Sequence, residues 1–381
     1  MKNIFYEMKK SWLKLPILLI LIALSAVDFY KFYFDFKIYG FMGWDNAELA
    51  KKVYYRVYEE NLKGEINDKK INYVIENRNE LEGISDMNDE EFASYIAFDW
   101  YIVPEFEYAV TYKNFSDKIV NKARENIYFY LEHGNHRQAA INRLIYDLYS
   151  GREINNYKLT NWVDSYFEHD FSSLLTLIMI IIGLSNCFSV EYESKMNVLI
   201  KSVGKIGKTV NGKIISMIIY ILFLTIFFTI TDLFITNYFI KIDGLNEPIY
   251  SAEFFKLSPL KCSLGSAILI CTILKFLSFL VFGGIVGLIS IIVKHYVFSL
   301  CLSFGTIAAL IEFTEKSKTI FNPVNILSPC NFIKEFSCIT FFETPIRTVI
   351  YIAVIYSLMC AFIIITIKLL TKERRRKNVK V

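Results

Sequence analysis

The sequence has few of the residues from which enzymes and metal proteins build their sites. Its 381 residues include only 4 histidines, which are scattered along the chain. The patterns G-x-S-x-G and H-E-x-x-H and a paired-cysteine metal motif are all absent. We therefore predict no catalytic residue, no metal site and no cofactor bound by this chain, which is not expected to be an enzyme.

Proline and cysteine are also scarce. Only 7 residues are proline, while 54% are hydrophobic and 16% aromatic, a composition too apolar for one soluble domain. The 7 cysteines do not form a disulfide framework, because most lie in apolar runs and none falls in 40–170. Cys330 and Cys338 are a close pair outside those runs. A bridge between them is one alternative, and two unpaired packing residues are the preferred one.

What the sequence has instead is long apolar runs. They lie near 15–34, 171–190, 214–239, 263–293, 296–313 and 347–370. Each approaches or exceeds the roughly 20 residues that cross a bilayer as a helix. We predict an all-α integral membrane protein with six transmembrane helices. The first run is interpreted as a retained span rather than a signal peptide, because it has no clear cleavage site.

Basic residues predict how the spans are oriented, because short basic loops stay in the cytoplasm. The chain start, the segment 191–213, the pair Lys294 and His295, and the tail KERRRKNVK are all basic. Six spans with both termini in the cytoplasm place all of these basic segments on the cytoplasmic side of the plasma membrane. The segment 40–170 then lies outside, and its 15 Lys and Arg against 24 Asp and Glu give it a net charge of −9.

The predicted domains follow from these patterns. Residues 1–39 form an amphipathic segment and the first span, 40–170 a mostly helical extracytoplasmic domain, and 171–381 a five-span membrane domain with a basic cytoplasmic tail. The helical spacing of apolar residues in the outer domain predicts helices, one of which is capped at Ser116 and another of which ends at Gly151. The proline-broken stretch 314–346 predicts short re-entrant helices.

Two ionisable residues, Asp232 and Lys275, lie inside apolar runs, where a charge is costly and therefore suggests a function. In one interpretation Asp232 reaches the outer interface and Lys275 snorkels or pairs with it. In the other, one or both line a translocation path.

The segment 191–213 contains SVGKIGKT at 202–209, which approaches the phosphate-binding pattern G-x-x-x-x-G-K-[ST] with Ser202 in place of the first glycine. A true site follows a strand, whereas this segment is flanked by predicted spans. We therefore expect no nucleotide binding by this chain, so that any ATP chemistry belongs to a partner.

The same segment, read as FSVEYESKMNVLIKSVGKIGKTVNGKI, resembles the first cytoplasmic loop of type-2 ABC transporter permeases. The matching positions are Phe188, Glu191, Met196, Leu199, Ile200, Ser202, Gly212 and Lys213. Lys195 stands where the family usually has glycine. The stretches YYRVYEENLKGEINDKKINYVIENRNEL and NPVNILSP are similar to permeases of a low-GC Gram-positive subgroup with a large extracytoplasmic insertion.

This resemblance implies a permease subunit of an exporter. It would form a homodimer, or a heterodimer with a second permease, in the lipid bilayer, and would bind a cytoplasmic ABC ATPase that holds ATP and Mg; no nucleic acid is expected. The implied coupling residues are Glu191, Glu193, Met196, Leu199, Lys201, Lys205, Lys208 and Lys213. The alternative is a non-transporting receptor or immunity protein, whose acidic outer domain would attract a cationic peptide.

Overall fold

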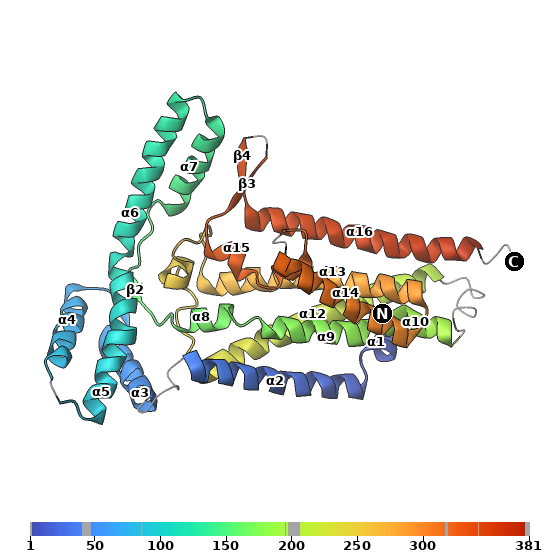
Figure 1. The fold of residues 1–381 in the computed structure, drawn as a ribbon, viewed down its shortest axis with the longest axis horizontal. Coiled ribbons are helices and arrows are strands. Elements are labelled where there is room, and N and C mark those ends of the chain that lie inside the picture. The colour runs from blue at the N-terminus through green and yellow to red at the C-terminus, as the bar shows by residue number, and fades with distance from the viewer. Residues whose placement is uncertain are drawn as a thin grey trace.

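The computed structural model describes residues 2–39, 47–84, 86–194, 196, 206–316, 319–341 and 343–377. Six of its helices are long and apolar enough to cross a membrane, and they run side by side in one bundle (Figure 1). They are α2 (Leu15–Tyr39), α9 (Phe171–Leu184) continued by α10 (Asn186–Glu193), α12 (Ile206–Phe239), α13 (Leu264–Val293), α14 (Tyr296–Lys316) and α16 (Thr348–Lys377). The prediction of an all-α membrane protein with six candidate spans is confirmed.

The outside of the bundle is apolar. Large side chains such as Phe234, Phe298 and Phe362 are about two thirds exposed. A soluble monomer rarely carries such surfaces over several neighbouring helices, whereas lipid covers them without cost. The second span is the most buried of the six, and the first, fifth and sixth are mostly exposed.

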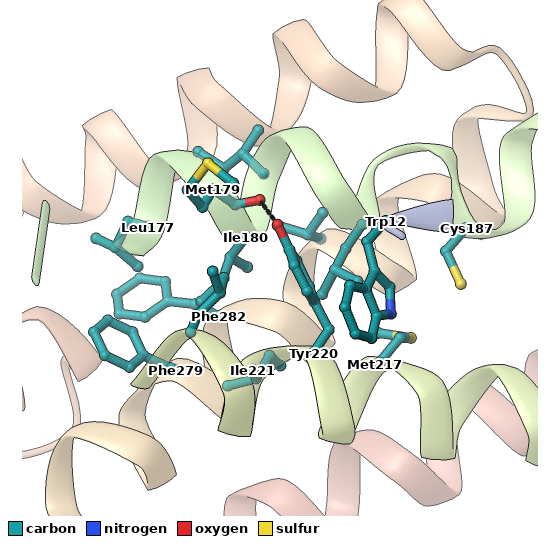
Figure 2. Close-up of a cluster of buried hydrophobic side chains, with 14 of the residues drawn as sticks. Trp12, Leu177, Met179, Ile180, Cys187, Met217, Tyr220, Ile221, Phe279 and Phe282 are labelled. Carbon is teal, nitrogen blue, oxygen red and sulfur yellow. Dashed lines mark hydrogen bonds between the residues drawn. The ribbon is translucent and has the colours of Figure 1, made fainter. Parts of the chain in front are cut away.

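Close helix packing forms the centre of the bundle, where α13 contacts α9, α12, α14 and α16. Gly183 of α9 allows one such approach, because a Cβ atom there would lie 2.4 Å from the ring of Tyr220 on α12. The Tyr220 hydroxyl donates a hydrogen bond to the Met179 carbonyl at 2.8 Å, and its ring stacks on Trp12 with centroids 4.9 Å apart (Figure 2).

The N-terminal helix α1 (Lys2–Ser11) lies against α12. Trp12, which follows it, donates from Nε1 to the hydroxyl of Ser216 at 3.2 Å. Both ends of the described chain lie at the end of the bundle that is remote from the helices α3 to α7 (Figure 1). We call this the terminal end and the opposite one the domain end.

The helices at the domain end form a separate unit, the helical domain. It consists of α3 (Ala47–Val57), α4 (Asp68–Glu82), α5 (Asp89–Ile96), α6 (Val103–Glu132) and α7 (His136–Tyr149), and α8 (Trp162–Phe167) leads from it into α9. The two-residue strands β1 (Gly64–Glu65) and β2 (Asn156–Tyr157) pair antiparallel. Its apolar core is rich in buried tyrosines, including Tyr54, Tyr112 and Tyr157.

One helix start in this domain was predicted wrongly. Ser116 does not cap a helix, because α6 runs without interruption from Val103, with a proline in its first turn. The Ser116 hydroxyl instead donates to the Tyr149 carbonyl at 2.7 Å and so joins α6 to α7. The predicted stop at Gly151 is confirmed: α7 ends at Tyr149, and Gly151 has a φ of +70°, which favours glycine.

A connector, residues 240–262, lies between the helical domain and the bundle. It contains two 3₁₀ turns, Ile249–Ser251 and Glu253–Phe255. Tyrosine hydroxyls of the domain donate to its backbone: Tyr108 to the Tyr250 carbonyl and Tyr149 to the Leu257 carbonyl, both at 2.7 Å. The domain is therefore docked on the bundle through backbone groups of the connector.

The stretch 314–346 combines short helices with a hairpin. A 3₁₀ turn (Pro323–Ile326) and α15 (Cys330–Lys334) are followed by β3 (Cys338–Phe341) and β4 (Thr344–Arg347), which pair antiparallel with Cys338 opposite Arg347. The hairpin was not predicted, and it packs against α7. Cys330 and Cys338 are free thiols, as are the other cysteines, all of which lie in the described part of the chain.

Candidate functional site

Four charged side chains meet at the terminal end of the bundle, and we call them the ionic cluster: Glu7, Lys10, Glu191 and Lys213. Lys213 is 1% exposed, and its Nζ lies 3.0 Å from Oε1 of Glu191. The same oxygen is 2.7 Å from Nζ of Lys10, while Oε2 of Glu7 is 3.9 Å from Nζ of Lys213. The cluster therefore joins α1, α10 and α12.

The charges of the ionic cluster balance one another. Two carboxylates face two ammonium groups, which is the arrangement that makes buried charge tolerable. Lys213 also donates to the Cys187 carbonyl and lies 4.8 Å from the centre of the Phe188 ring. Burial raises the pKa of the Glu7 carboxyl, and the nearby Lys213 and Lys10 oppose that rise.

Glu193, at the end of α10, makes a second connection at the same end of the bundle. Its Oε1 accepts a hydrogen bond from the backbone N–H of Tyr296 at 2.7 Å and lies 2.9 Å from Nδ1 of His295. The start of the segment 191–213 is thus attached to α1, to α12 and to the turn between α13 and α14.

The remaining predicted coupling residues divide into two groups. Lys208 is exposed near the start of α12, and Met196 is half-buried. Leu199, Lys201 and Lys205 lie outside the described residues. Lys213 was grouped with them, but because it is buried it belongs to the packing of the bundle and not to an exposed surface. Gly207 and Lys208 lie in the first turn of α12.

A polar cavity lies inside the bundle, between α9, α12, α13 and α15. Its volume is about 480 Å³, including the part that opens to the outside. Its polar lining includes Ser172, Ser173, Thr176, Thr225, Asp232 and Lys275. The two ionisable residues singled out from the sequence thus line one cavity. Because much of that volume lies between atoms or opens to the outside, the enclosed space suits one or two water molecules.

In one of the two interpretations, Lys275 snorkels or pairs with Asp232. The structure shows another partner for it. Its Nζ lies 3.7 Å from Oδ1 of Asp170, at the start of α9, and Asp170 also accepts a hydrogen bond from Ser328. The ion pair shown for Lys275 is therefore with Asp170 and not with Asp232.

Asp232 belongs to a different group of side chains. Its Oδ2 accepts a hydrogen bond from Ser172 at 2.7 Å, and its carboxyl lies near that of Asp28 on α2. His169 lies beside them, with Nε2 2.9 Å from Oδ1 of Asp28. One ligand atom from each of Asp28, His169 and Asp232 lies within 4.8 Å of the others. Among the described residues, these three have the geometry to hold a metal ion.

Several of these residues were missed in the sequence. Asp28 is an acid within the first apolar run, so the rule that identified Asp232 and Lys275 also applies to it. His169 and Asp170 stand at the edge of the second run, where a charge is unremarkable. Glu7 lies in the amphipathic start, and no local signal shows that it faces Lys213, because their contact depends on the packing of α1 against α12.

Models of known protein families give no match to this chain, and comparisons with curated proteins and with solved structures give none either.

Proposed function

We propose that the chain is the permease subunit of an ABC transporter that exports its substrate with energy from a separate ATPase. The observation that supports this most directly is the ion pair between Glu191 and Lys213. These residues stand at the two ends of the segment that resembles a permease coupling loop. Because they are joined, a force on that segment acts on α10 and α12 together.

The proposed mechanism follows that connection. Closure of the ATPase pushes on residues 196–208, and the ionic cluster transmits the displacement to α10 and α12. The cavity lies between α9, α12 and α13, so that a tilt of these helices changes its access. The ATPase would bind one arrangement of the helices better than the other and so shift their populations.

The proposal also implies how the chain is oriented in the membrane. The terminal end, with its basic segments, faces the cytoplasm, and the helical domain lies outside the cell membrane. Two copies, or this chain and a related permease, assemble with two ATPases. The substrate is not specified by this proposal.

Capture of the full-length chain from its native membranes, with Mg and ATP present, tests the proposal. We expect an ATPase with a phosphate-binding loop to be retained. The double charge reversal Lys205→Glu and Lys208→Glu should reduce its recovery at least tenfold, while membrane insertion is unchanged. The control is Lys118→Glu with Lys122→Glu, which reverses two exposed charges on α6 of the helical domain. Full retention of the ATPase by the Lys205 and Lys208 variant would refute the proposed coupling.

A receptor or immunity protein is the second candidate, and the separate core of the acidic helical domain favours it. Deletion of 46–165 distinguishes the two functions. A receptor would lose all binding of a cationic peptide and all activity, whereas a permease would keep its ATPase partner.

A further inference from the structure

We propose that Asp28, His169 and Asp232 form a binding site for a divalent transition metal ion, of which Zn²⁺ is the best match. The three residues come from α2, from the link between α8 and α9, and from α12, so that a bound ion would connect the first three spans. This inference does not depend on the transport function.

The first argument is the charge of the site. Asp28 is fully buried and Asp232 is 6% exposed, and a carboxyl oxygen of one lies within 4.8 Å of a carboxyl oxygen of the other. Two facing carboxylates at such buried positions need a cation or a shared proton between them, because their mutual repulsion is not compensated by apolar surroundings. Lys275 also attracts the Asp232 carboxylate, but it forms an ion pair with Asp170, so that its single positive charge is shared between two acids.

The second argument is that ligand atoms at the site lack hydrogen-bond partners. Oδ2 of Asp28 and Oδ1 of Asp232 are buried, and neither has a partner among the described residues. A buried polar atom without a partner is rare in proteins and calls for an explanation such as a bound ion. Ligation by a metal would satisfy both oxygens.

The third argument is the match to zinc chemistry. Zn²⁺ takes imidazole nitrogen and carboxylate oxygen as ligands at about 2 Å, which puts tetrahedral ligand atoms roughly 3.3 Å apart. The ligand atoms here lie within 4.8 Å of one another, so that small side-chain rotations suffice. The hydrogen bond from Ser172 to Asp232 at 2.7 Å would orient the carboxylate, as outer partners of metal ligands do. Phe32 packs its ring edge-on against His169 and restricts it.

Metal binding can be measured on the full chain, purified in detergent through a tag without histidine and freed of metal with a chelator. Co²⁺, whose visible spectrum reports ligand number, is titrated first, and Zn²⁺ is then added in competition. We expect one equivalent of Co²⁺ with a four- or five-coordinate spectrum, displaced by Zn²⁺. Asp28→Asn and Asp232→Asn should each weaken binding at least tenfold.

Asp35→Asn is the matched control, because Asp35 lies on the same helix as Asp28 but pairs with Lys31 and not with the three ligands. It should bind one equivalent with unchanged affinity. A wild-type protein that takes up no Co²⁺ or Zn²⁺ would overturn the proposal whatever the variants do. Equal binding by Asp232→Asn and wild type would overturn it as well. So would a carboxylic acid infrared band that persists in the wild type at neutral pH with excess Zn²⁺ present and is lost in Asp232→Asn, since the cation at the site is then a proton.

Discussion

Arg152 of the helical domain donates a hydrogen bond from Nη2 to the Ser258 carbonyl of the connector at 3.0 Å. Its Nε donates to the Leu148 carbonyl at the end of α7, at 2.8 Å. Arg152 is 3% exposed, and its guanidinium lies 4.3 Å from the centre of the Tyr149 ring and 5.0 Å from that of Tyr250. One planar group therefore joins the last turn of α7 to the backbone of the connector, and so fixes the domain on the bundle.

Arg152→Ala should loosen this junction. The substitution leaves buried carbonyl groups without a donor, and we expect a loss of about 2 to 3 kcal/mol in the free energy of unfolding. Arg152→Lys keeps the charge but not the planar fork of donors. Its free energy of unfolding should therefore lie between those of the wild type and of Arg152→Ala. Thermal unfolding in detergent and protease cleavage within 240–262 measure the effect. Cleavage as slow in Arg152→Ala as in the wild type would show that the tyrosine contacts hold the connector alone.

Glu105 makes the stability of the helical domain depend on pH. Its Oε2 accepts hydrogen bonds from Tyr54 at 2.8 Å and from Tyr157 at 3.0 Å, and burial raises its pKa from 4.5 to about 7. The stabilisation from holding the acid neutral is fully present below pH 4.5 and is lost as the pH rises through 7. The shift corresponds to about 3 kcal/mol.

We therefore expect the wild type to unfold at a lower temperature at pH 8 than at pH 5. Glu105→Gln keeps an oxygen for the two tyrosines but carries no charge, so this part of the pH dependence should disappear. Glu107→Gln, at an exposed position of the same helix, is the control. If wild type and Glu105→Gln lost the same stability between the two pH values, another group would be responsible.

The membrane bundle could be predicted from the sequence because its signal is local. Each span is a continuous apolar run, and the end of α7 at Gly151 follows from the conformation that glycine allows. The start of α6 could not be predicted in the same way. Ser116 looks like a cap in its local sequence, but its hydroxyl binds the carbonyl of Tyr149 on the next helix.

Single residues of the candidate site could be predicted from the sequence, but the contacts between them could not. Asp232 and Lys275 stand out because charges inside apolar runs are rare, and both line the cavity. Which acid Lys275 pairs with depends on how α9 packs against α13, which no local pattern shows. The burial of Lys213 has the same origin, since it requires α1 and α10 to meet α12.

Gly183 should tolerate no side chain. A Cβ atom there would lie 2.4 Å from the Tyr220 ring, which is held by Met179 and Trp12 and cannot move away freely. We expect Gly183→Ala to destabilise the protein by about 1 to 3 kcal/mol. Gly305→Ala is the matched control, because nothing lies within 4 Å of its Cβ position on α14. It should unfold at the wild-type temperature or above, since alanine favours helix. Equal unfolding temperatures for the two variants would contradict this description of the α9 and α12 contact.

Lys213 tests whether the ionic cluster acts as one unit. Lys213→Met keeps the length of the side chain but leaves Glu191 and Glu7 short of one positive charge, and breaking a buried pair in this way costs about 3 to 5 kcal/mol. Lys208→Met, at an exposed position of the same helix, should change stability little. Thermal unfolding in detergent compares the two variants.

The double variant Lys213→Met with Glu191→Gln identifies the cause of that loss. If the cost of Lys213→Met comes from the unpaired carboxylate, removing the charge of Glu191 should recover part of it, and the two effects should fall short of additivity by about 1 kcal/mol or more. Lys10 is 2.7 Å from the same oxygen of Glu191 and would then lose its own partner, which limits the recovery. Strict additivity would mean that Lys213 stabilises α12 through the Cys187 carbonyl and the Phe188 ring, and that Glu191 is not the residue that joins α10 to α12.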